Sequence, residues 1–467
     1  MYFKFLSVLL FSVICSCSVP DTALWNERST AKSIGMPAEA FTKVVVLGNL
    51  TTLVRNPISS NKKRLWMFKK RSEIVAGDIA LFATVDDSYR RNHSIEAHLD
   101  KIKIPARVAG TVDYLIDGEA FFGALQNSVE NAKKSIDTRV FIYDNDDLAV
   151  AYSEHLKRKS KDMRCRVIMD ELGSLSSWWG DPESKMPDGF KSPGSMPHYI
   201  EKNSKVSVRL SKNPGLVTDH AKLFIIDEKE AYLGGMNIGR EYRVEWHDMM
   251  VRVKGPVVNI LQNEFNKAWR LQGRTGDWTY PLKFTKRYRR TIRQNELGIR
   301  VLKTSPGKTQ IERAMIAAIR MAKKRIYLQN SYFTSNSLEK ELIAALERGV
   351  EVNLVYPQEN DSQLLAKSNE HFVHSLYKEG ANIYAYPKFS HVKALIVDDW
   401  VCLGSANCDA LSMRINEEIN IAFTDKKKAN ELINDLFKKD IRKSKRLRDL
   451  KVDKLEGALL KPIVDQL

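Results

Sequence analysis

The sequence contains one short pattern twice: Asp219-His220-Ala221-Lys222-Leu223-Phe224-Ile225-Ile226-Asp227 and Ser390-His391-Val392-Lys393-Ala394-Leu395-Ile396-Val397-Asp398. In each copy one residue separates a histidine from a lysine, and an apolar run leads from the lysine to an aspartate. Side chains two residues apart on a strand point to the same face. The pattern therefore predicts two strands, each presenting one imidazole and one ammonium group on a common face.

A glycine-containing turn and an acidic residue follow each copy at matching positions. The turns are Leu233-Gly234-Gly235-Met236-Asn237 and Leu403-Gly404-Ser405-Ala406-Asn407. Glycine permits a close backbone turn that returns each asparagine to the site. Eleven residues after these asparagines come Asp248 and Glu418. A carboxylate behind an imidazole fixes its tautomer and raises its basicity, so we expect Asp248 to support His220 and Glu418 to support His391.

The sequence around the two copies is duplicated as well. Short apolar runs alternate with amphipathic helical patterns in the same order in both halves, which favours βαβ units with helices on both sides of a sheet. We predict an α/β fold of two pseudo-symmetric α-β-α sandwich domains with mixed, mostly parallel sheets sharing one active site. The predicted strands are 138–143, 166–170, 206–210, 327–333, 351–355 and 382–386, and the predicted helices include 149–159 and 338–348.

Shifts in composition predict how the rest of the chain is organised. The predicted parts are a signal peptide at 1–17, an N-terminal extension at 18–105, a first domain at 106–280, a basic linker at 281–296, a second domain at 297–425 and a basic C-terminal tail at 426–467. Strands are expected at 43–47 and 79–85 within the extension. The tail is expected to be helical, with a solvated basic face.

Two segments leave alternatives open. Residues 62–71 place Trp66 and Phe68 among basic residues. Such a segment suits a membrane interface, nucleic acid, or an ordinary basic hairpin or loop at the surface. Residues 178–197 contain four prolines, which argue against a regular element. That stretch is either a lid or lipid-contacting loop, or a packed structural loop.

The N-terminus has the pattern of a targeting segment. Lys4 precedes an apolar run at 5–14, which is too short to span a bilayer and suits a secretory signal. Ile14-Cys15-Ser16-Cys17 resembles a bacterial lipobox, which implies lipidation of Cys17 and a membrane-associated place in the cell envelope. A non-lipid signal peptide and an uncleaved anchor are the alternatives. Three other cysteines follow no disulfide or zinc spacing and are predicted core residues: Cys165, Cys402 and Cys408.

Composition limits the class of protein and of partner. Hydrophobic residues make up 43% of the chain, which excludes global disorder. The formal net charge is +17, which favours anionic membrane surfaces, nucleic acid or phosphate-bearing substrates. Charge alone does not choose among these partners, and a generally basic surface without a special partner is the plain alternative.

The repeated pattern resembles the signature of the phospholipase D superfamily, HxKxxxxDxxxxxxGSxN, over roughly residues 105–425. The resemblance implies phosphodiester chemistry at one site, with no metal or other cofactor. His220 is expected to attack phosphorus and form a phosphohistidine, while His391 acts as acid and base. The expected phosphate-binding residues are Lys222, Lys393, Asn237, Asn407 and Ser405. Asp227 and Asp398 complete the motif and are expected to hold turns.

The sequence departs from the family pattern at three places. Gly235 stands where the signature has serine, and five residues separate Asp398 from Gly404 where the first copy has six. Ser331 replaces the proline of the family's Pro-Tyr-Phe segment. These departures leave the catalytic atoms intact and bear on the substrate pocket.

The layout around 234–242, Gly-Gly-Met-Asn-Ile-Gly-Arg-Glu-Tyr, is similar to that of bacterial cardiolipin synthases. The resemblance implies a phospholipase D-type phosphodiesterase or phosphatidyltransferase that acts on membrane phospholipids, as a monomer with an internal pseudo-dimer. One alternative is a metal-independent endonuclease of the same superfamily. A non-catalytic phosphate- or membrane-binding protein is disfavoured, because both sets of His, Lys and Asn are complete.

Overall fold

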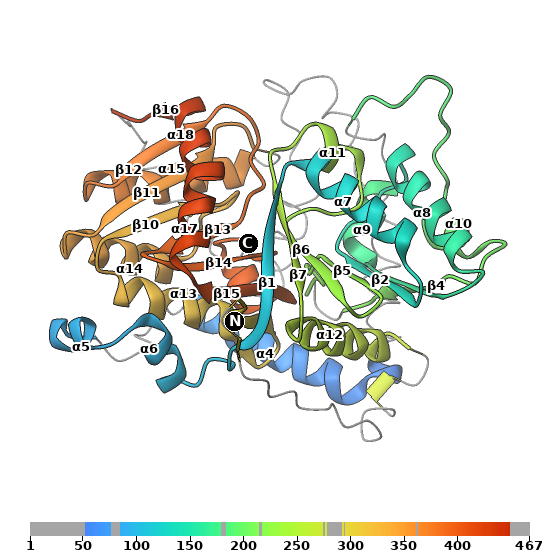
Figure 1. Cartoon of the computed structure of the whole chain (residues 1–467), viewed down its shortest axis with the longest axis horizontal. Helices are drawn as coiled ribbons and strands as arrows, with labels where there is room; N and C mark the ends of the chain where they lie inside the picture. Colours follow the sequence, from blue (N-terminus) through green and yellow to red (C-terminus); the bar gives the residue numbers. More distant parts are fainter. Residues whose placement is uncertain are drawn as a thin grey trace, which may run out of the picture.

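A computed structural model describes residues 52–75, 85–178, 184–213, 217–273, 276–277, 292–293, 295–360 and 363–448. The predicted signal peptide, the strand expected at 43–47 and most of the strand expected at 79–85 lie outside these residues. So do most of the basic linker and the end of the tail. Figure 1 shows two halves side by side, with the long strand β1 (Val108–Ile116) between them.

Within the described residues, each half contributes seven strands to the sheet in the same spatial order. The first half runs β4 (Ser207–Ser211), β3 (Arg164–Asp170), β2 (Ser135–Val140), β5 (Leu223–Ile226), β6 (Glu230–Gly234), β7 (Met249–Lys254) and β1. The second half runs β12 (Asn382–Tyr386), β11 (Glu351–Pro357), β10 (Arg325–Gln329), β13 (Ala394–Val397), β14 (Trp400–Gly404), β15 (Glu418–Thr424) and β8 (Leu297–Ser305). A short antiparallel pairing of β1 with β8 joins the halves, and the two short strands β9 (Lys308–Thr309) and β16 (Lys445–Arg446) pair with β8 and β12. The predicted duplication is confirmed.

The sheets are mixed, as predicted, but parallel pairs are the minority. β2, β3 and β4 are parallel to one another, as are β10, β11 and β12. The strands that follow each histidine, β5–β6–β7 and β13–β14–β15, form antiparallel hairpins. A connection of a few residues can only reverse the chain, whereas a helical crossover keeps strands parallel. The prediction that most strands of the mixed sheets are parallel is therefore wrong.

Helices cover the outer faces of both halves, and an inner core lies between the halves (Figure 1). The outer helices of the first half are α7 (Gly118–Asn131), α8 (Asp147–Lys159), α10 (Met196–Glu201) and α11 (Arg240–Val244). Those of the second half are α13 (Gln310–Met321), α14 (Asn336–Glu347), α15 (Gln363–Lys378) and α16 (Ala410–Arg414). The inner core combines apolar residues of both sheets with α12 (Val257–Leu271). The two halves therefore share a hydrophobic core rather than merely touching.

The start of the predicted basic tail belongs to this inner core. Residues after 425 form α17 (Lys426–Leu432), a π-helical turn (Ile433–Phe437) and α18 (Lys438–Lys443). Leu436 and Phe437 are fully buried in the inner core. The lysines of these helices occupy the outer side of an amphipathic element, which explains why the sequence suggested a solvated face. The helices follow β15 as α12 follows β7, so they complete the second domain.

The helices α4 (Pro57–Val75), α5 (Asp87–Asn92) and α6 (Ile95–Lys101) precede the first domain in the described part of the chain. Residues 62–71 lie inside α4, so the hairpin or loop alternative is wrong. Residues 184–195 form no helix or strand, as predicted, but Met196 and Pro197, at the end of the predicted irregular stretch, begin α10. Trp178, at the start of the predicted irregular stretch, is the last residue of α9 (Glu171–Trp178). It donates its indole N–H to the carbonyl oxygen of Tyr143 (2.8 Å).

The three cysteines outside the N-terminal segment are buried and free, as predicted. Among the residues described, we find no helix with the length and apolar character needed to cross a membrane.

The two motif aspartates hold turns at the far ends of β5 and β13. The carboxylate of Asp227 accepts hydrogen bonds from the backbone N–H groups of Lys133, Lys134 and Ser135. Asp398 does the same for residues 323–325 in the second half. Both aspartates have positive φ, 55° and 54°, a conformation that Asp and Asn tolerate best after glycine. This geometry agrees with the expected turn-holding role.

We predict that Asp227→Ala lowers the free energy of unfolding by about 2 kcal/mol, because three N–H donors lose a charged acceptor. Chemical denaturation measures the change. Asp188→Ala, at an exposed position in the irregular stretch, serves as the control and should change stability by less than about 0.5 kcal/mol. Equal stability of the two variants would contradict the assignment.

Candidate active site

The histidine of each motif lies in an extended segment that pairs with the other half of the chain. The N–H of His220 donates to the carbonyl oxygen of Glu417 (2.9 Å), and the N–H of Glu417 donates to that of Thr218 (2.9 Å). At the related position, the N–H of His391 donates to the carbonyl oxygen of His247 (2.7 Å). Both histidines precede β5 and β13, so they stand just outside the strands in which we expected them.

Each imidazole is hydrogen-bonded to a carboxylate from the opposite half. Nδ1 of His220 lies 2.9 Å from Oε1 of Glu418, and Nδ1 of His391 lies 2.7 Å from Oδ2 of Asp248. The expected pairing within each repeat is therefore wrong. The backbone pairing places the start of β15 beside His220 and the segment before β7 beside His391, so the nearest carboxylate comes from the other repeat. Because the hydrogen bond to the carboxylate uses Nδ1, the Nε2 atom of each ring remains available to react.

The two histidines and the two motif lysines form one buried cluster. Nζ of Lys222 and Nζ of Lys393 donate to the carbonyl oxygens of His220 and His391 (2.9 and 2.8 Å). Burial holds the pKa of His391 well below its usual range, and Lys393, Lys222 and His220 add repulsion. Burial also lowers the pKa of Lys222 to about 7. Mutual repulsion among these groups favours an anion between them.

The two supporting carboxylates differ in charge. Burial alone would raise the pKa of Glu418, but His220, Lys222 and Ser405 outweigh burial and lower it. The hydroxyl of Ser405 donates to Glu418 (2.6 Å), so it supports a carboxylate rather than lying free for phosphate as expected. Burial raises the pKa of Asp248 to about 7. The carboxylate of the His220 pair is therefore held ionised, whereas the carboxyl group behind His391 has a raised proton affinity.

Close packing at Asp248 explains the glycine that replaces serine at 235. A Cβ at Gly235 would lie 2.2 Å from Oδ1 of Asp248, nearer than any real Cβ contact. A serine there would displace the carboxylate that holds His391. Glycine at 235 therefore leaves room for Asp248 in the first half, whereas Ser405 hydrogen-bonds to Glu418 in the second half.

The asparagines are placed unequally. Asn237 accepts the backbone N–H groups of Phe141 and Ile142 (3.1 and 3.0 Å) and donates to the hydroxyl of Tyr242 (2.8 Å). It therefore fixes the loop after β2 in addition to any contact with a phosphate. The Oδ1 of Asn407 is buried and has no hydrogen-bond partner among the described residues. Phosphate binding by either asparagine stays a prediction.

Comparison with known proteins agrees with this geometry. Residues 125–269 and 315–441 match the family described as "Cardiolipin synthase, PLD-like domain". A cardiolipin synthase of Listeria monocytogenes is 31% identical over 352 residues, 72% of this chain and 70% of that protein. The chain belongs to this phospholipase D family. The chain is also 26% identical to cardiolipin synthase 2 of Staphylococcus epidermidis over 446 residues, which make up 90% of this chain and 84% of that protein.

A solved structure shares the fold of this family member. Phosphatidylserine synthase from Haemophilus influenzae aligns with a TM-score of 0.58 and 13% identity over 80% of this chain and 96% of that chain. At this identity the match supports the two-domain fold alone. The family match and the relatives found by sequence identify the chain as a phospholipase D-family enzyme of the phosphatidyltransferase type.

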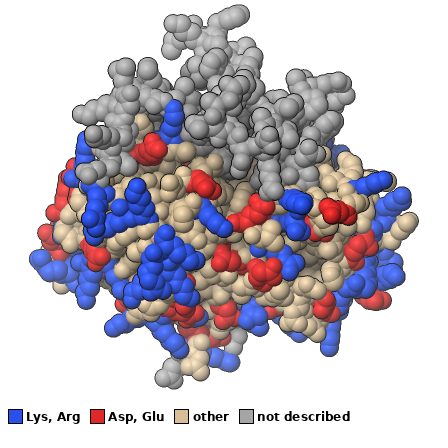
Figure 2. Space-filling view, turned by 90° about the horizontal axis from the view of Figure 1, so that it is seen from above, with Lys and Arg blue, Asp and Glu red and all other residues tan. Residues whose placement is uncertain are grey.

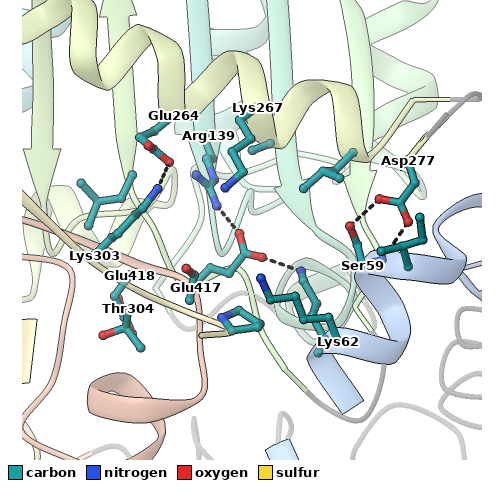
Figure 3. Close-up of a pocket in the computed structure, with 17 residues that line it drawn as sticks. Ser59, Lys62, Arg139, Glu264, Lys267, Asp277, Lys303, Thr304, Glu417 and Glu418 are labelled. Carbon is teal, nitrogen blue, oxygen red and sulfur yellow. Dashed lines mark hydrogen bonds and ion pairs between the residues drawn. The ribbon is translucent and has the colours of Figure 1, made fainter. Parts of the chain in front are cut away.

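An ion-pair network that sequence reasoning missed lies behind His220 in this phospholipase D-family enzyme. The guanidinium of Arg139 bonds to Asp219 (2.7 Å) and to Glu417 (2.8 Å), as Figure 3 shows for the second pair. Glu417 also accepts from Lys63 of α4. Glu417 and Glu418 both line a cavity of about 340 Å³ beneath α4. The only signal in the sequence is that Glu417 directly precedes a predicted site residue.

A histidine clamp occupies the related place behind His391. Nδ1 of His247 lies 2.6 Å from Asp117, and Nε2 lies 2.7 Å from Asp440 of α18. Asp440 also accepts from the side chain of Gln329 (2.9 Å). Burial would lower the pKa of His247, but the two carboxylates outweigh it and raise the pKa to about 9. A charged imidazole therefore ties the first domain to the second.

The clamp predicts a pH-dependent stability. Because the folded-state pKa of His247 is raised from about 6.5 to about 9, its contribution is complete below pH 6.5 and is lost as pH rises through 9. His247→Gln should therefore be less stable than the wild type by about 3 kcal/mol at pH 6, and the gap should close toward pH 10. Chemical denaturation of both proteins across this range measures the gap. A gap independent of pH would contradict a charged clamp.

Aromatic side chains surround His391 but not His220. The ring of His391 lies near Trp246 (5.3 Å), Phe389 (5.8 Å) and Tyr242 (5.9 Å), measured between centroids. Among the described residues, His220 has one such neighbour, Phe141 at 4.9 Å. The surroundings of His391 are therefore more aromatic than those of His220, and its side chain is less exposed (7% against 13%).

One cluster of carboxylates lies apart from the histidines. Asp144, Asp146 and Glu241 bring oxygens within 4.8 Å of one another, the closest approach to a metal site among the described residues. Asp146 caps α8 through the N–H of Ala149 (2.7 Å) and accepts from the N–H of Arg240. Burial raises its pKa to about 7. These backbone contacts account for Asp146, and the expectation that the enzyme needs no metal stays a prediction.

We predict that Gly235→Ala lowers kcat at least about a hundredfold, because the added methyl group displaces the carboxylate behind His391. Gly123→Ala is the matched control, since a Cβ at that helical position meets nothing within 4 Å and alanine favours the helix. Phosphodiester turnover is the measurement, with thermal unfolding run in parallel. Wild-type turnover in a folded Gly235→Ala variant would contradict the proposed packing.

Proposed function

We propose that the chain transfers a phosphatidyl group from one phospholipid to the hydroxyl of another, in the manner of a cardiolipin synthase, through a phosphohistidine. The observation that carries the proposal is the crossed arrangement of two His–carboxylate pairs around two buried lysines. Two imidazoles beside two lysine ammonium groups provide a nucleophile and an acid for one bound phosphate. The family relatives named cardiolipin synthase support the phospholipid as substrate.

In the first step, Nε2 of His220 attacks the phosphorus of the donor lipid. The proton on Nδ1 is held by Glu418, whose lowered pKa keeps it ionised, so the lone pair of Nε2 is free. The bond between phosphorus and the leaving glycerol oxygen breaks as the P–N bond forms. His391 gives its Nε2 proton to that oxygen. Free glycerol leaves, and the phosphatidyl group remains on His220.

In the second step, the hydroxyl of an acceptor phosphatidylglycerol attacks the same phosphorus. His391 takes the hydroxyl proton back, the P–N bond breaks, and His220 is regenerated. The sum of the two steps is two phosphatidylglycerols giving one cardiolipin and one glycerol. The apolar ring of Trp246, Phe389 and Tyr242 around His391 favours a lipid alcohol over water as the second nucleophile.

The buried lysines supply the field for the transition state. Lys222 and Lys393 lie in a low-dielectric site, where their interaction with a phosphoryl oxygen is stronger than in water. Without an anion, their burial is unfavourable, and the lowered pKa of Lys222 expresses that cost. A bound phosphodiester restores the full charge of Lys222, so substrate binding and catalysis draw on the same interaction.

The predicted lipidation at Cys17 and placement in the cell envelope are part of the proposal. Both would hold the enzyme beside its substrate. They rest on the signal-like sequence, which lies outside the described residues.

The test is turnover of vesicles of phosphatidylglycerol and phosphatidylethanolamine in EDTA, with products identified by mass spectrometry. We expect cardiolipin and glycerol from the wild type, and losses of about 10³-fold or more in His220→Ala and His391→Ala. His93→Ala, at an exposed site in the extension, should retain full activity. Phosphatidic acid in place of cardiolipin would show hydrolysis rather than transfer. Intact lipid with cleaved DNA would move the assignment to a nuclease.

A further inference from the structure

Helix α4 carries an apolar stripe along its exposed side, and one member of the stripe, Ile58, also borders the cavity beneath the helix. Ile58 and Leu65 are each 72% exposed and Phe68 is 55% exposed. Spacings of seven and three residues place these side chains on one face of a helix. Val54, 78% exposed in the turn before α4, extends the stripe. Large apolar side chains aligned in this way mark an interaction surface rather than ordinary surface scatter.

Basic side chains flank the stripe. Lys62 and Lys69 are exposed beside Ile58, Leu65 and Phe68, and Lys62 also borders the cavity beneath the helix (Figure 3). Within α4, the sequence Pro57–Val75 contains one acidic residue, Glu73, against six basic residues. The outer face of α4 is thus apolar along its centre and cationic along its edge.

The inner face of α4 fixes the helix firmly to the catalytic domains. Lys63 bonds to Glu417, and the indole N–H of Trp66 donates to the carbonyl oxygen of Arg414 (2.8 Å). Met67 is buried in a small core with Val217, Ala410 and Ile415. Because the inner face is occupied, the apolar stripe cannot turn inward.

We infer that the outer face of α4 docks onto an anionic phospholipid bilayer, with Ile58, Leu65 and Phe68 in the interface and Lys62 and Lys69 at the headgroups. Lysines bury their methylene stems beside an apolar stripe while keeping the ammonium group at the phosphate level. The inference rests on the proposed function, since a bilayer would carry the substrate.

Charge argues against the other occupants of this face. A second copy of the chain would bring the lysines of two stripes against each other. A nucleic acid would use the lysines but leave the aliphatic side chains of Ile58 and Leu65 in water. An anionic bilayer satisfies both components at once.

The position of α4 links docking to the active site. α4 lies along the lower edge of the molecule in Figure 1, below α12. Figure 2 shows the molecule from above, where Lys and Arg lie among Asp and Glu in the part of that face drawn in colour. Through Lys63 and Glu417, α4 is attached to the residue preceding Glu418, the partner of His220. The inferred membrane contact is therefore joined to the active site by direct side-chain contacts.

The first experiment reads insertion directly. A polarity-sensitive fluorophore is attached to Leu65→Cys in the full chain, with Cys15 and Cys17 replaced by serine so that no lipid anchor contributes. The control label is at Gln126→Cys on the exposed side of α7. We expect a blue shift and a several-fold rise in emission at 65 with phosphatidylglycerol vesicles, none with phosphatidylcholine vesicles, and none at 126.

Three outcomes would overturn the inference. Vesicles could pull the protein down without changing the label at 65, so that another surface binds. The label could lose water exposure without vesicles as protein concentration rises, so that a second copy covers α4. Emission could change with duplex DNA rather than with vesicles, so that nucleic acid is the partner.

The second experiment separates docking from chemistry. Ile58→Ser, Leu65→Ser and Phe68→Ser combined should weaken vesicle binding about tenfold or more and lower vesicle turnover accordingly. Turnover of short-chain, monomeric phosphatidylglycerol should be unchanged, because the catalytic residues are untouched. Equal vesicle binding by the variant and the wild type would refute docking. No turnover of either lipid by the wild type, with the label still responding, would refute the proposed function and leave docking intact.

Discussion

The hydrogen bond between each motif imidazole and a carboxylate from the opposite half is the interaction on which the rest of the structure depends. His220 pairs with Glu418, and His391 pairs with Asp248, so neither half alone contains both members of a His–carboxylate pair. The shared inner core and the backbone pairing at Glu417 and His247 hold the two halves in the register that these bonds require. A duplicated fold thus yields one site rather than two.

The two repeats share one strand order but differ in the side chains that lie behind their motif histidines. Asp219 pairs with Glu417 across the halves, and His247 pairs in the same way with Ser390. One junction is held by a guanidinium between carboxylates, and the other by an imidazolium between carboxylates. Both solutions place a cation among acids in a buried position, where unpaired charges would be strongly unfavourable. Ser405 donates to Glu418, whereas Gly235 leaves room for Asp248, so the two turns support the two carboxylates in different ways.

The sequence was sufficient for much of the fold, because apolar periodicity and the duplicated order are local patterns. It also identified every side chain of the central cluster. It could not give the pairing of His220 with Glu418, since counting along the chain favours the carboxylate in the same repeat and contains no information on how two sheets meet. Hydrogen bonding across the halves also displaced His220 and His391 from the strands. The helices after 425 were taken for a tail because their lysines outnumber the few apolar residues that reach the core, such as Leu436 and Phe437.

The crossed pairing can be tested directly by NMR of the imidazole Nδ1–H protons in protein labelled with ¹⁵N-histidine. The strongly hydrogen-bonded resonances of His220 and His391 are assigned from their loss in the two alanine variants. The account predicts that Glu418→Gln shifts or removes the His220 resonance and leaves that of His391 in place, while Asp248→Asn does the reverse. Loss of the His391 resonance in Glu418→Gln, with the His220 resonance unchanged, would contradict the crossed site and return each carboxylate to its own repeat.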